Sequence, residues 1–166
     1  MTDHSLKVLV LCTGNSCRSI LAEAMLNELG KGRIKAYSAG STPAAAPNPN
    51  AISLLKDQGI DTDFARSKSW NEFSGEANPN MDIIITVCDN AANETCPIWN
   101  GAPGTAHWGI PDPADVIEPQ AAITAAFQKT WQQLEDRVSR FLKLPIENMN
   151  PKELRDAMNK IGAECS

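Results

Sequence analysis

The sequence predicts an α/β protein with a parallel sheet covered by helices on both faces, because strand-length apolar runs alternate with helical patterns. The clearest run, residues 82–87, contains three consecutive isoleucines. Continuous apolar strands of this kind are typical of buried parallel sheets. Right-handed crossovers then limit the topology, and ligands of such sheets lie beyond the carboxyl ends of the strands.

The chain opens with an apolar strand at residues 6–11, followed by a helix that begins at about Ser19. Three apolar residues recur on one face of this helix and are expected to be buried: Leu21, Met25 and Leu29. Glycines at 30 and 32 stop the helix, and residues 34–39 form a second, short strand. Residues 40–50 hold three prolines and form a loop.

A short helix with Pro49 in its first turn follows this loop and ends at Gly59. Residues 61–80 are polar and irregular, with Trp70 and Phe73 as expected anchors to the core. The strand at 82–87 comes next, and a weaker strand is expected at 105–108.

Two helices complete the predicted fold. Apolar residues at steps of three and four predict the longer one: Ile123, Phe127, Trp131, Leu134, Val138 and Phe141. Asn150, Pro151 and Glu153 have the pattern of an N-cap, a first-turn proline and a capping box at the start of the final helix. We expect Leu154, Met158 and Ile161 to face inward there and Gly162 to end the helix.

Composition restricts the class of protein. At 166 residues the chain is predicted to form one domain over 1–166, with a C-terminal helical extension at about 145–166. No apolar run is long enough to cross a bilayer, and the net charge of −5 argues against nucleic acid as a partner. The polar first residues resemble no secretory signal, and five cysteines in such a chain indicate a reducing cytoplasm. We expect a monomer.

The most informative stretch is CTGNSCRS at 12–19, which places Cys12 on the turn between the first strand and the first helix. Successive backbone N–H groups and the positive end of the helix dipole form a concave site for an anion there. The same field and the nearby Arg18 favour a thiolate, so Cys12 is expected to be largely ionised at neutral pH. Arg18 would hold two oxygens of a tetrahedral oxyanion. A cysteine that only fills the core is disfavoured by the other loop residues.

Three stretches resemble the low-molecular-weight tyrosine phosphatase superfamily and, within it, the arsenate reductases recycled by thioredoxin: CTGNSCRS at 12–19, VCDNAANETCP at 87–97 and HWGIPDPA at 107–114. The resemblance implies a flavodoxin-like three-layer fold with a four-stranded parallel sheet in the order 2-1-3-4. It also implies reduction of arsenate to arsenite in arsenic detoxification, with no metal or organic cofactor. Phosphate and sulfate would bind as analogues.

If strands 1 and 3 are neighbours, Cys12 and Cys88 both follow the ends of adjacent strands, which lie about 4.8 Å apart. A disulfide needs Cα atoms about 4.4–6.8 Å apart, so the two thiols could be bridged with modest movement. Cys96 lies eight positions after Cys88, across a segment with no large apolar residue, which we expect to move. These three cysteines predict a disulfide relay that thioredoxin or a similar dithiol protein reduces, with glutaredoxin or a low-molecular-weight thiol as the alternative donors. A zinc site of Cys88, Cys96 and His107 is disfavoured, because the spacing matches no common zinc pattern.

Other residues of the three stretches receive narrower roles. Asp112, before Pro113, matches the family's general acid, and an ordinary Asp-Pro turn is the alternative. The predicted oxyanion-binding residues are Thr13, Gly14, Asn15, Ser16, Cys17, Arg18 and Ser19. Within this set Ser19 is placed to donate to the Cys12 thiolate and Asn15 to brace the loop. Trp108 is expected in the core, and no catalytic role is assigned to Cys17 or Cys165.

One departure from the family concerns a cation. Relatives linked to thioredoxin often bind potassium beside the loop through an acidic residue, whereas residues 66–69 here are Arg-Ser-Lys-Ser. We hypothesise that the Lys68 ammonium replaces the ion, and a solvated surface lysine is the alternative.

Two other functions stay open from the sequence. A low-molecular-weight protein tyrosine phosphatase would use Cys12, Arg18 and Asp112 without the relay, although the single tyrosine, Tyr37, gives no evident stacking wall for phosphotyrosine. A non-enzymatic thiol sensor would signal through oxidation of Cys88 and Cys96. Repeated release of arsenite separates an enzyme from a sensor.

Overall fold

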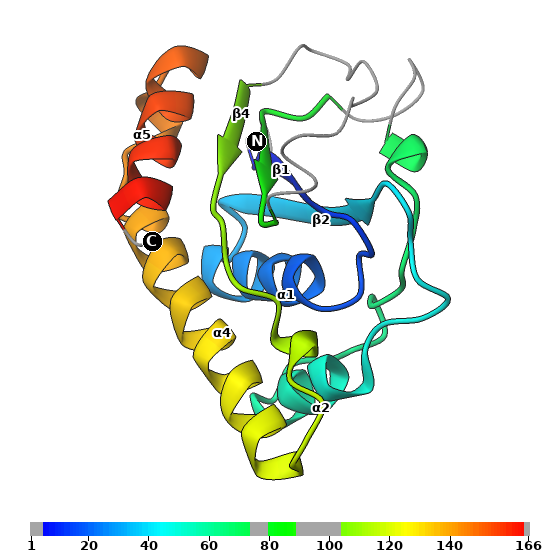
Figure 1. The fold of residues 1–166 in the computed structure, drawn as a ribbon. Coiled ribbons are helices and arrows are strands. Elements are labelled where there is room, and N and C mark those ends of the chain that lie inside the picture. Colours follow the sequence, from blue (N-terminus) through cyan, green and yellow to red (C-terminus); the bar gives the residue numbers. More distant parts are fainter. Residues whose placement is uncertain (1–4, 74–79, 89–103, 165–166) are drawn as a thin grey trace.

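The computed structural model describes residues 5–73, 80–88 and 104–164. Its centre is a parallel sheet in the order β2-β1-β3-β4, shown in Figure 1. The strands are β1 (Leu6–Cys12), β2 (Ile34–Gly40), β3 (Ile83–Thr86) and β4 (Gly104–His107). The predicted α/β class and the order 2-1-3-4 are confirmed, with strand limits within about two residues of those expected.

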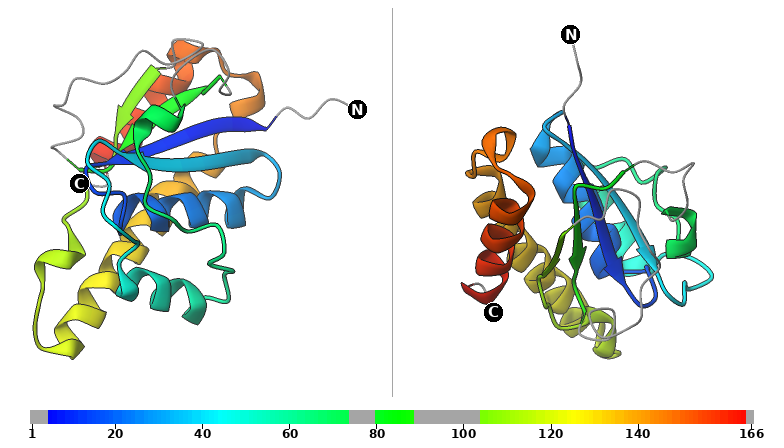
Figure 2. Two further views of the ribbon diagram at one scale, coloured as in Figure 1. Left: turned by 90° about the vertical axis from the view of Figure 1, so that its right-hand side faces the viewer. Right: turned by 90° about the horizontal axis from the view of Figure 1, so that it is seen from above.

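The helices are α1 (Arg18–Gly30), α2 (Pro49–Asp57), α4 (Gln120–Leu142) and α5 (Pro151–Glu164). Helix α1 packs against β1 and β2, α4 packs against α1 and α2, and α5 packs against β4, as Figures 1 and 2 show. The sequence did not predict three short 3-10 turns: η1 (Trp70–Phe73), η2 (Pro113–Asp115) and η3 (Ile146–Asn148).

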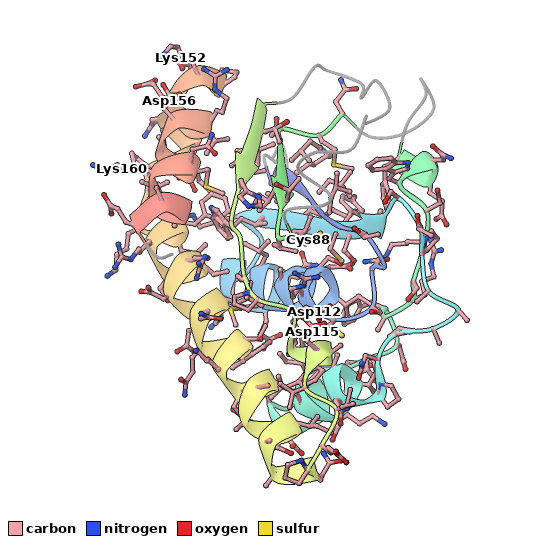
Figure 3. The ribbon with its side chains drawn as sticks, in the orientation of Figure 1. Cys88, Asp112, Asp115, Lys152, Asp156 and Lys160 are labelled. Atoms are coloured by element: carbon pink, nitrogen blue, oxygen red, sulfur yellow. The ribbon has the colours of Figure 1, made fainter. Side chains whose placement is uncertain are left out.

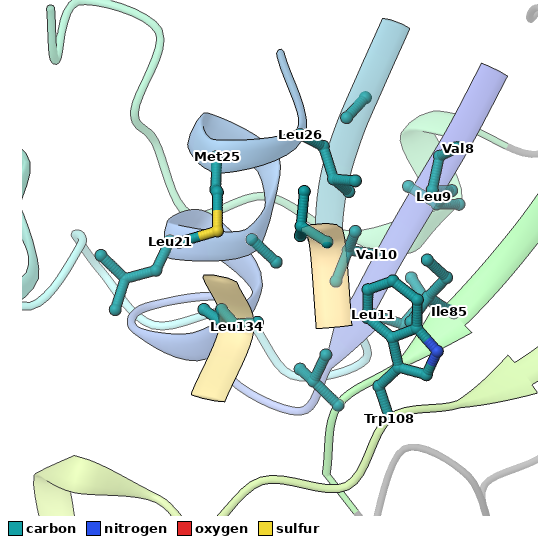
Figure 4. Packing of buried hydrophobic residues seen from close by; sticks show 14 of the residues in the cluster. Val8, Leu9, Val10, Leu11, Leu21, Met25, Leu26, Ile85, Trp108 and Leu134 are labelled. Atoms are coloured by element: carbon teal, nitrogen blue, oxygen red, sulfur yellow. The ribbon is translucent and has the colours of Figure 1, made fainter. Parts of the chain in front are cut away.

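The core forms where the central strands meet α1 and α4 (Figure 4). Residues 8–11 of β1 are all fully buried, and every residue of β3 is buried. This is the burial expected of strands with neighbours on both edges and cover on both faces. Trp108 is also fully buried, as predicted, and its indole N–H donates to the Met158 carbonyl at 2.9 Å.

Helix α5 begins at the predicted capping box. The Glu153 N–H donates to Asn150 Oδ1 at 2.8 Å, and the Asn150 N–H donates to Glu153 Oε1 at 3.1 Å. The buried side of α5 includes the three residues that were expected to face inward, Leu154, Met158 and Ile161. This last helix therefore contributes to the core.

Two expectations about the helices are wrong. Leu29 is 40% exposed, because it lines an open hollow of about 150 Å³ beside Trp131 and Glu135 of α4 and does not pack into the core. Gly162 does not end α5, which continues to Glu164. A Cβ at Gly162 would lie 2.1 Å from the His107 carbonyl oxygen, so this glycine allows the close packing of α5 on the end of β4.

Phe73 is buried as expected and its ring centroid lies 5.4 Å from that of Tyr37, whereas Trp70 is only half-buried. The described helices include none with the length and apolar character that a membrane span requires.

Candidate active site

The loop between β1 and α1 takes its shape from Asn15, whose φ of 48° lies in the left-handed region. Asparagine tolerates this conformation better than most residues. Its side-chain amide donates to Ser19 Oγ at 2.8 Å and Ser38 Oγ at 3.0 Å, and its Oδ1 accepts from the Lys68 N–H at 2.9 Å. These three bonds fix a backbone conformation that would otherwise be sparsely populated.

Gly40, at the end of β2, lets that strand approach the loop closely. A Cβ there would lie 2.4 Å from the Thr13 carbonyl oxygen and 2.9 Å from the Cys12 carbonyl oxygen. Both contacts are with backbone, which cannot rotate away. The path of the loop over β2 therefore requires glycine at this position.

The sulfur of Cys12 is held from two sides. The Asn15 backbone N–H donates to Cys12 Sγ at 3.2 Å, and Ser19 Oγ lies 2.9 Å from the same sulfur. Because Ser19 Oγ already accepts from Asn15, its own proton is directed at the sulfur. These two bonds hold the Cys12 sulfur in a fixed position at the start of the loop.

A pocket of about 190 Å³ opens above this sulfur. Eight residues line it: Cys12, Thr13, Gly14, Ser16, Cys17, Arg18, Cys88 and Asp112. They come from the loop after β1, the start of α1, the end of β3 and the loop after β4. In Figure 3, Cys88 and Asp112 lie near one another beside α1. The pocket thus forms at the carboxyl ends of the strands, where the sequence predicts it.

Cys88 reaches this pocket because β3 runs alongside β1. Leu11 pairs with Thr86, and Cys88 follows two residues later. Thr13 Oγ1 lies 3.6 Å from Cys88 Sγ, so the loop hydroxyl and the second thiol are in contact. Cys12, Cys17 and Cys88 carry reduced thiols. Cys12 and Cys88 therefore share the wall of one pocket.

Arg18 and Asp112 also line the pocket and contact each other. Arg18 Nη2 lies 3.4 Å from Asp112 Oδ2, and Arg18 Nη1 donates to the Ile110 carbonyl at 3.0 Å. The Ala114 N–H donates to the other carboxylate oxygen of Asp112 at 3.0 Å. A cation and a carboxyl group are thereby both held in the lining of the pocket.

The structure separates the predicted binding residues into two groups. Thr13, Gly14, Ser16, Cys17 and Arg18 line the pocket, whereas Asn15 and Ser19 do not. Both of the latter side chains are fully buried beneath the loop. Ser19 Oγ lies at the Cys12 sulfur and the Asn15 amide donates to Ser38, which are the positions that the narrower roles given to these two residues require.

Two of the five cysteines considered in the sequence analysis are not among the residues that the structure describes. Cys96 and Cys165 lie outside the described residues. Cys17 is described and 3% exposed, and burial raises the pKa of its thiol to about 11. It is therefore protonated at neutral pH and serves the pocket as an uncharged wall residue.

A buried charged network under the loop was only partly anticipated. Lys68 is 6% exposed, which excludes the solvated surface lysine. Its Nζ lies 3.8 Å from Glu23 Oε1 and donates to Ser38 Oγ at 3.4 Å and to the Arg66 carbonyl at 3.2 Å. Ser38 in turn donates to Glu23. The chain of bonds continues through Asn15 and Ser19 to the Cys12 sulfur.

Burial has the largest effect on the pKa values of Glu23 and Lys68. It raises the pKa of Glu23, against the lowering effect of the Lys68 charge and the Ser38 hydroxyl. It lowers the pKa of Lys68, against the raising effect of Glu23. Sequence reasoning missed Glu23 and Ser38. The available signal was a carboxylate one helical turn after Ser19 in an otherwise apolar stretch of α1.

Comparison with known proteins decides the family. The sequence model described as low molecular weight phosphotyrosine protein phosphatase matches residues 7–156. The chain belongs to this family. It is 34% identical over 131 residues to the arsenate reductase of Bacillus subtilis strain 168, covering 79% of this chain and 91% of that protein. An arsenate reductase of Bacillus cereus is 31% identical over 142 residues, covering 86% and 98%.

Solved structures agree with this assignment. The crystal structure of an arsenate reductase from Archaeoglobus fulgidus superposes with a TM-score of 0.64 at 26% identity, covering 82% of this chain and 99% of that chain. Within the described residues, no group of three or more His, Cys, Asp and Glu side chains could hold a metal ion.

Proposed function

We propose that this chain of the phosphatase family reduces arsenate to arsenite, as part of arsenic detoxification. The observation that carries the proposal is that Cys12 and Cys88 line one pocket together with Arg18. A phosphatase needs a single nucleophile, whereas a reductase needs a second thiol within reach of the first. The curated relatives are named arsenate reductases, which supports the same activity here.

The first step binds and attacks the oxyanion. Arsenate occupies the pocket with its oxygens toward the N–H groups of the loop and toward the Arg18 guanidinium. The Cys12 thiolate attacks arsenic and forms a sulfur–arsenic bond, and one oxygen leaves as water with a proton from Asp112. Arg18 balances the negative charge that builds up on the remaining oxygens.

The second step transfers electrons. The Cys88 sulfur attacks the Cys12 sulfur, the sulfur–arsenic bond breaks and its electron pair stays on arsenic, which leaves as arsenite. The two sulfurs are oxidised to a Cys12–Cys88 disulfide. Cys96 then attacks Cys88, which releases the Cys12 thiolate and forms a Cys88–Cys96 disulfide.

The cycle closes with an external dithiol. We propose thioredoxin or a similar dithiol protein as the reductant of the Cys88–Cys96 bond, in the cytoplasm, where the chain works as a monomeric single domain. No metal or organic cofactor takes part in these steps. The C-terminal part of the chain, from about 145 onward, supports the fold through α5.

We also propose that the Lys68 ammonium fills the role of a potassium ion. It sits among Glu23, Ser38 and the Arg66 carbonyl, three oxygen groups that suit a monovalent cation. Turnover of the native chain should then be independent of potassium, and added potassium should restore part of the activity of Lys68→Ala. Strong activation of the native chain by potassium, with an unaffected Lys68→Ala variant, would remove this idea.

Arsenate-dependent oxidation of NADPH in the presence of thioredoxin and its reductase tests the main proposal. The native chain should release arsenite repeatedly, and Cys12→Ser, Cys88→Ser and Cys96→Ser should each abolish turnover. Cys165→Ser, at a cysteine to which no role is assigned, is the matched control and should turn over. Normal turnover by Cys88→Ser and Cys96→Ser would favour the phosphatase function, and a single stoichiometric oxidation would favour a sensor.

A further inference from the structure

We propose that Arg137, on the buried face of α4, is a positioning residue for Asp112, the carboxyl group that gives up a proton in the first step of the proposed function. This inference rests on that proposed function and adds to it a residue outside the pocket. Arg137 is only 1% exposed, and the described lining of the pocket over Cys12 does not include it. Any effect of Arg137 on the reaction must therefore pass through other groups.

The place of Arg137 on α4 is unusual for a charged residue. The other buried residues of this helix are apolar except for one threonine: Phe127, Thr130, Trp131, Leu134, Val138 and Phe141. Taking a charged side chain out of water is costly unless hydrogen bonds compensate for the loss. A well-packed apolar residue would often stabilise such a position as well or better. The guanidinium therefore has a task other than filling the core.

The hydrogen bonds of Arg137 show what it holds. Its Nη1 donates to the carbonyl of Gln133, one helical turn earlier in α4, at 3.0 Å. Its Nη2 donates to the carbonyl of Gly109 at 3.2 Å. The first bond fixes the guanidinium on its own helix, so the second bond ties the segment after β4 to α4. Gly109 lies three residues before Asp112 in this segment.

A second arginine holds the next carbonyl of the same segment. Arg18 Nη1 donates to the Ile110 carbonyl at 3.0 Å, and the Ile110 N–H donates to the Val87 carbonyl at 3.1 Å. Arg18 belongs to α1 and Arg137 to α4, so two helices hold consecutive carbonyls of the chain. The path of the segment is thereby fixed just before Asp112.

Two prolines carry this placement on to the carboxyl group. Asp112 stands between Pro111 and Pro113, and a proline ring fixes φ and removes the backbone N–H. The stretch is therefore stiff and has few backbone donors of its own to bind it to the fold. After it, the Ala114 N–H donates to Asp112 Oδ1 at 3.0 Å, and η2 packs against α4. Release of the Gly109 carbonyl should accordingly shift the Asp112 carboxyl group.

A double-mutant cycle on arsenate reduction tests whether Arg137 acts through Asp112. Arg137→Met keeps an unbranched side chain but cannot donate, and it should lower kcat/KM for arsenate about 10²-fold, the cost of a shift of about 1 Å at a reacting group. In an Asp112→Asn background the same substitution should change kcat/KM by no more than about twofold, because the acid that it positions is already absent. Arg137→Lys, which can still donate to the Gly109 carbonyl, should recover part of the rate.

Two controls separate positioning from a general loss of structure. Phosphate, as a competitive inhibitor, should keep its inhibition constant in Arg137→Met, because the lining of the pocket is unchanged. Val138→Ala is the matched variant, since Val138 is the next residue of α4 and is fully buried, and it should lower stability while leaving kcat/KM near the parent value. If Arg137→Met does not fold, Arg137→Leu takes its place in the cycle.

An equal loss from Arg137→Met in both backgrounds would show that it acts on the fold as a whole and would overturn the inference. An unchanged kcat/KM, or a comparable loss from Val138→Ala, would overturn it too.

A second measurement does not depend on arsenate chemistry. Hydrogen exchange of the Ala114 N–H, followed by nuclear magnetic resonance, should become about tenfold faster in Arg137→Met, because the bond from this N–H to Asp112 is loosened. The Glu153 N–H, which is bonded in the capping box of α5, should keep its exchange rate. Unchanged exchange at Ala114 overturns the inference. If the parent reduces no arsenate, the proposed function fails, and exchange at Ala114 alone then decides whether Arg137 positions Asp112.

Discussion

Cys12 and Cys17 belong to the same loop, yet their surroundings give them opposite chemistry. Two hydrogen-bond donors reach the Cys12 sulfur, from the Asn15 backbone and the Ser19 hydroxyl. Cys17 is buried with a weak contact from Ser16, 3.7 Å from its sulfur, and burial outweighs that contact. Of the two loop thiols that line the pocket, we therefore expect Cys12 to react and Cys17 to stay protonated at neutral pH.

This difference predicts selective alkylation. Burial raises the pKa of Cys17 to about 11, so iodoacetamide at pH 7.5 should modify Cys12 and leave Cys17 largely unmodified. Modification of Cys17 should become appreciable only as the pH approaches 11. Digestion and mass spectrometry of the 12–19 peptide measure both. Equal labelling of Cys12 and Cys17 at pH 7.5 would contradict the predicted difference in their reactivity.

A second prediction at the residue scale concerns the buried pair. Burial raises the pKa of Glu23 in the folded protein above its ordinary value of 4.5. The folded state therefore keeps its full stability below pH 4.5 and loses stability as the pH rises through the folded-state pKa of Glu23. Lys68→Met removes the main opposing charge and raises that pKa further. The variant should lose about 3 kcal/mol at pH 8 and little at pH 4.5.

Urea unfolding at the two pH values measures this dependence. Lys56→Met is the matched control, because Lys56 is exposed on α2, and it should change stability little at either pH. A loss from Lys68→Met that does not vary with pH would contradict the assignment of Glu23 as the responsible group.

The sequence predicts a site residue well when its partners lie close to it along the chain, and poorly when they come from distant segments. Cys12 and Arg18 belong to one short motif, so their spacing alone predicts a shared site. Glu23, Ser38 and Lys68 come from three separate segments, and their carboxylate, hydroxyl and ammonium look like ordinary surface groups until the segments pack. A resemblance to the family pointed to Lys68, and no pattern pointed to its partners.

At the scale of elements, periodicity predicts the middle of a helix better than its ends. The repeat that includes Leu21 and Met25 marks the buried face of α1, but Leu29, the next residue of the same repeat, lines an open surface hollow and is 40% exposed. Gly162 was expected to end a helix because glycine usually does so. Its role depends on the backbone of β4, which the local sequence does not contain.

That role can be tested by Gly162→Ala. Helix propensity alone predicts that alanine stabilises α5 by about 1 kcal/mol. The new Cβ would lie 2.1 Å from the His107 carbonyl oxygen, so we expect a net loss of about 1–3 kcal/mol instead. Thermal unfolding followed by circular dichroism gives the sign. A gain in stability would show that α5 can move away from β4 at little cost.

At the scale of the whole molecule, the middle of the last helix, α5, is bonded to the segment that follows β4. The Trp108 indole donates to the Met158 carbonyl, and both residues are fully buried. Arg33, at the start of β2, donates to the Leu142 and Leu144 carbonyls at 2.8 and 3.2 Å and so connects the opposite edge of the sheet to the end of α4. These bonds predict that the described parts unfold together.

Met158→Ala tests this cooperativity. We expect a loss of about 2–5 kcal/mol in the free energy of unfolding, from a cavity beside Trp108. Urea transitions followed by tryptophan fluorescence and by far-ultraviolet circular dichroism should still coincide. Met149→Ala is the control, because Met149 is only half-buried and should cost less. Separate transitions for the two probes would show that α5 unfolds independently.

The close approach of Gly40 to the Cys12 and Thr13 carbonyls also limits how the protein can evolve. Even alanine at this position would meet main-chain atoms at 2.4 Å. A library with all twenty amino acids at position 40, selected in bacteria for growth on arsenate, should return glycine codons alone. Variation that retunes the pocket for other oxyanions is therefore expected at positions other than 40, such as Asp112 in the pocket lining.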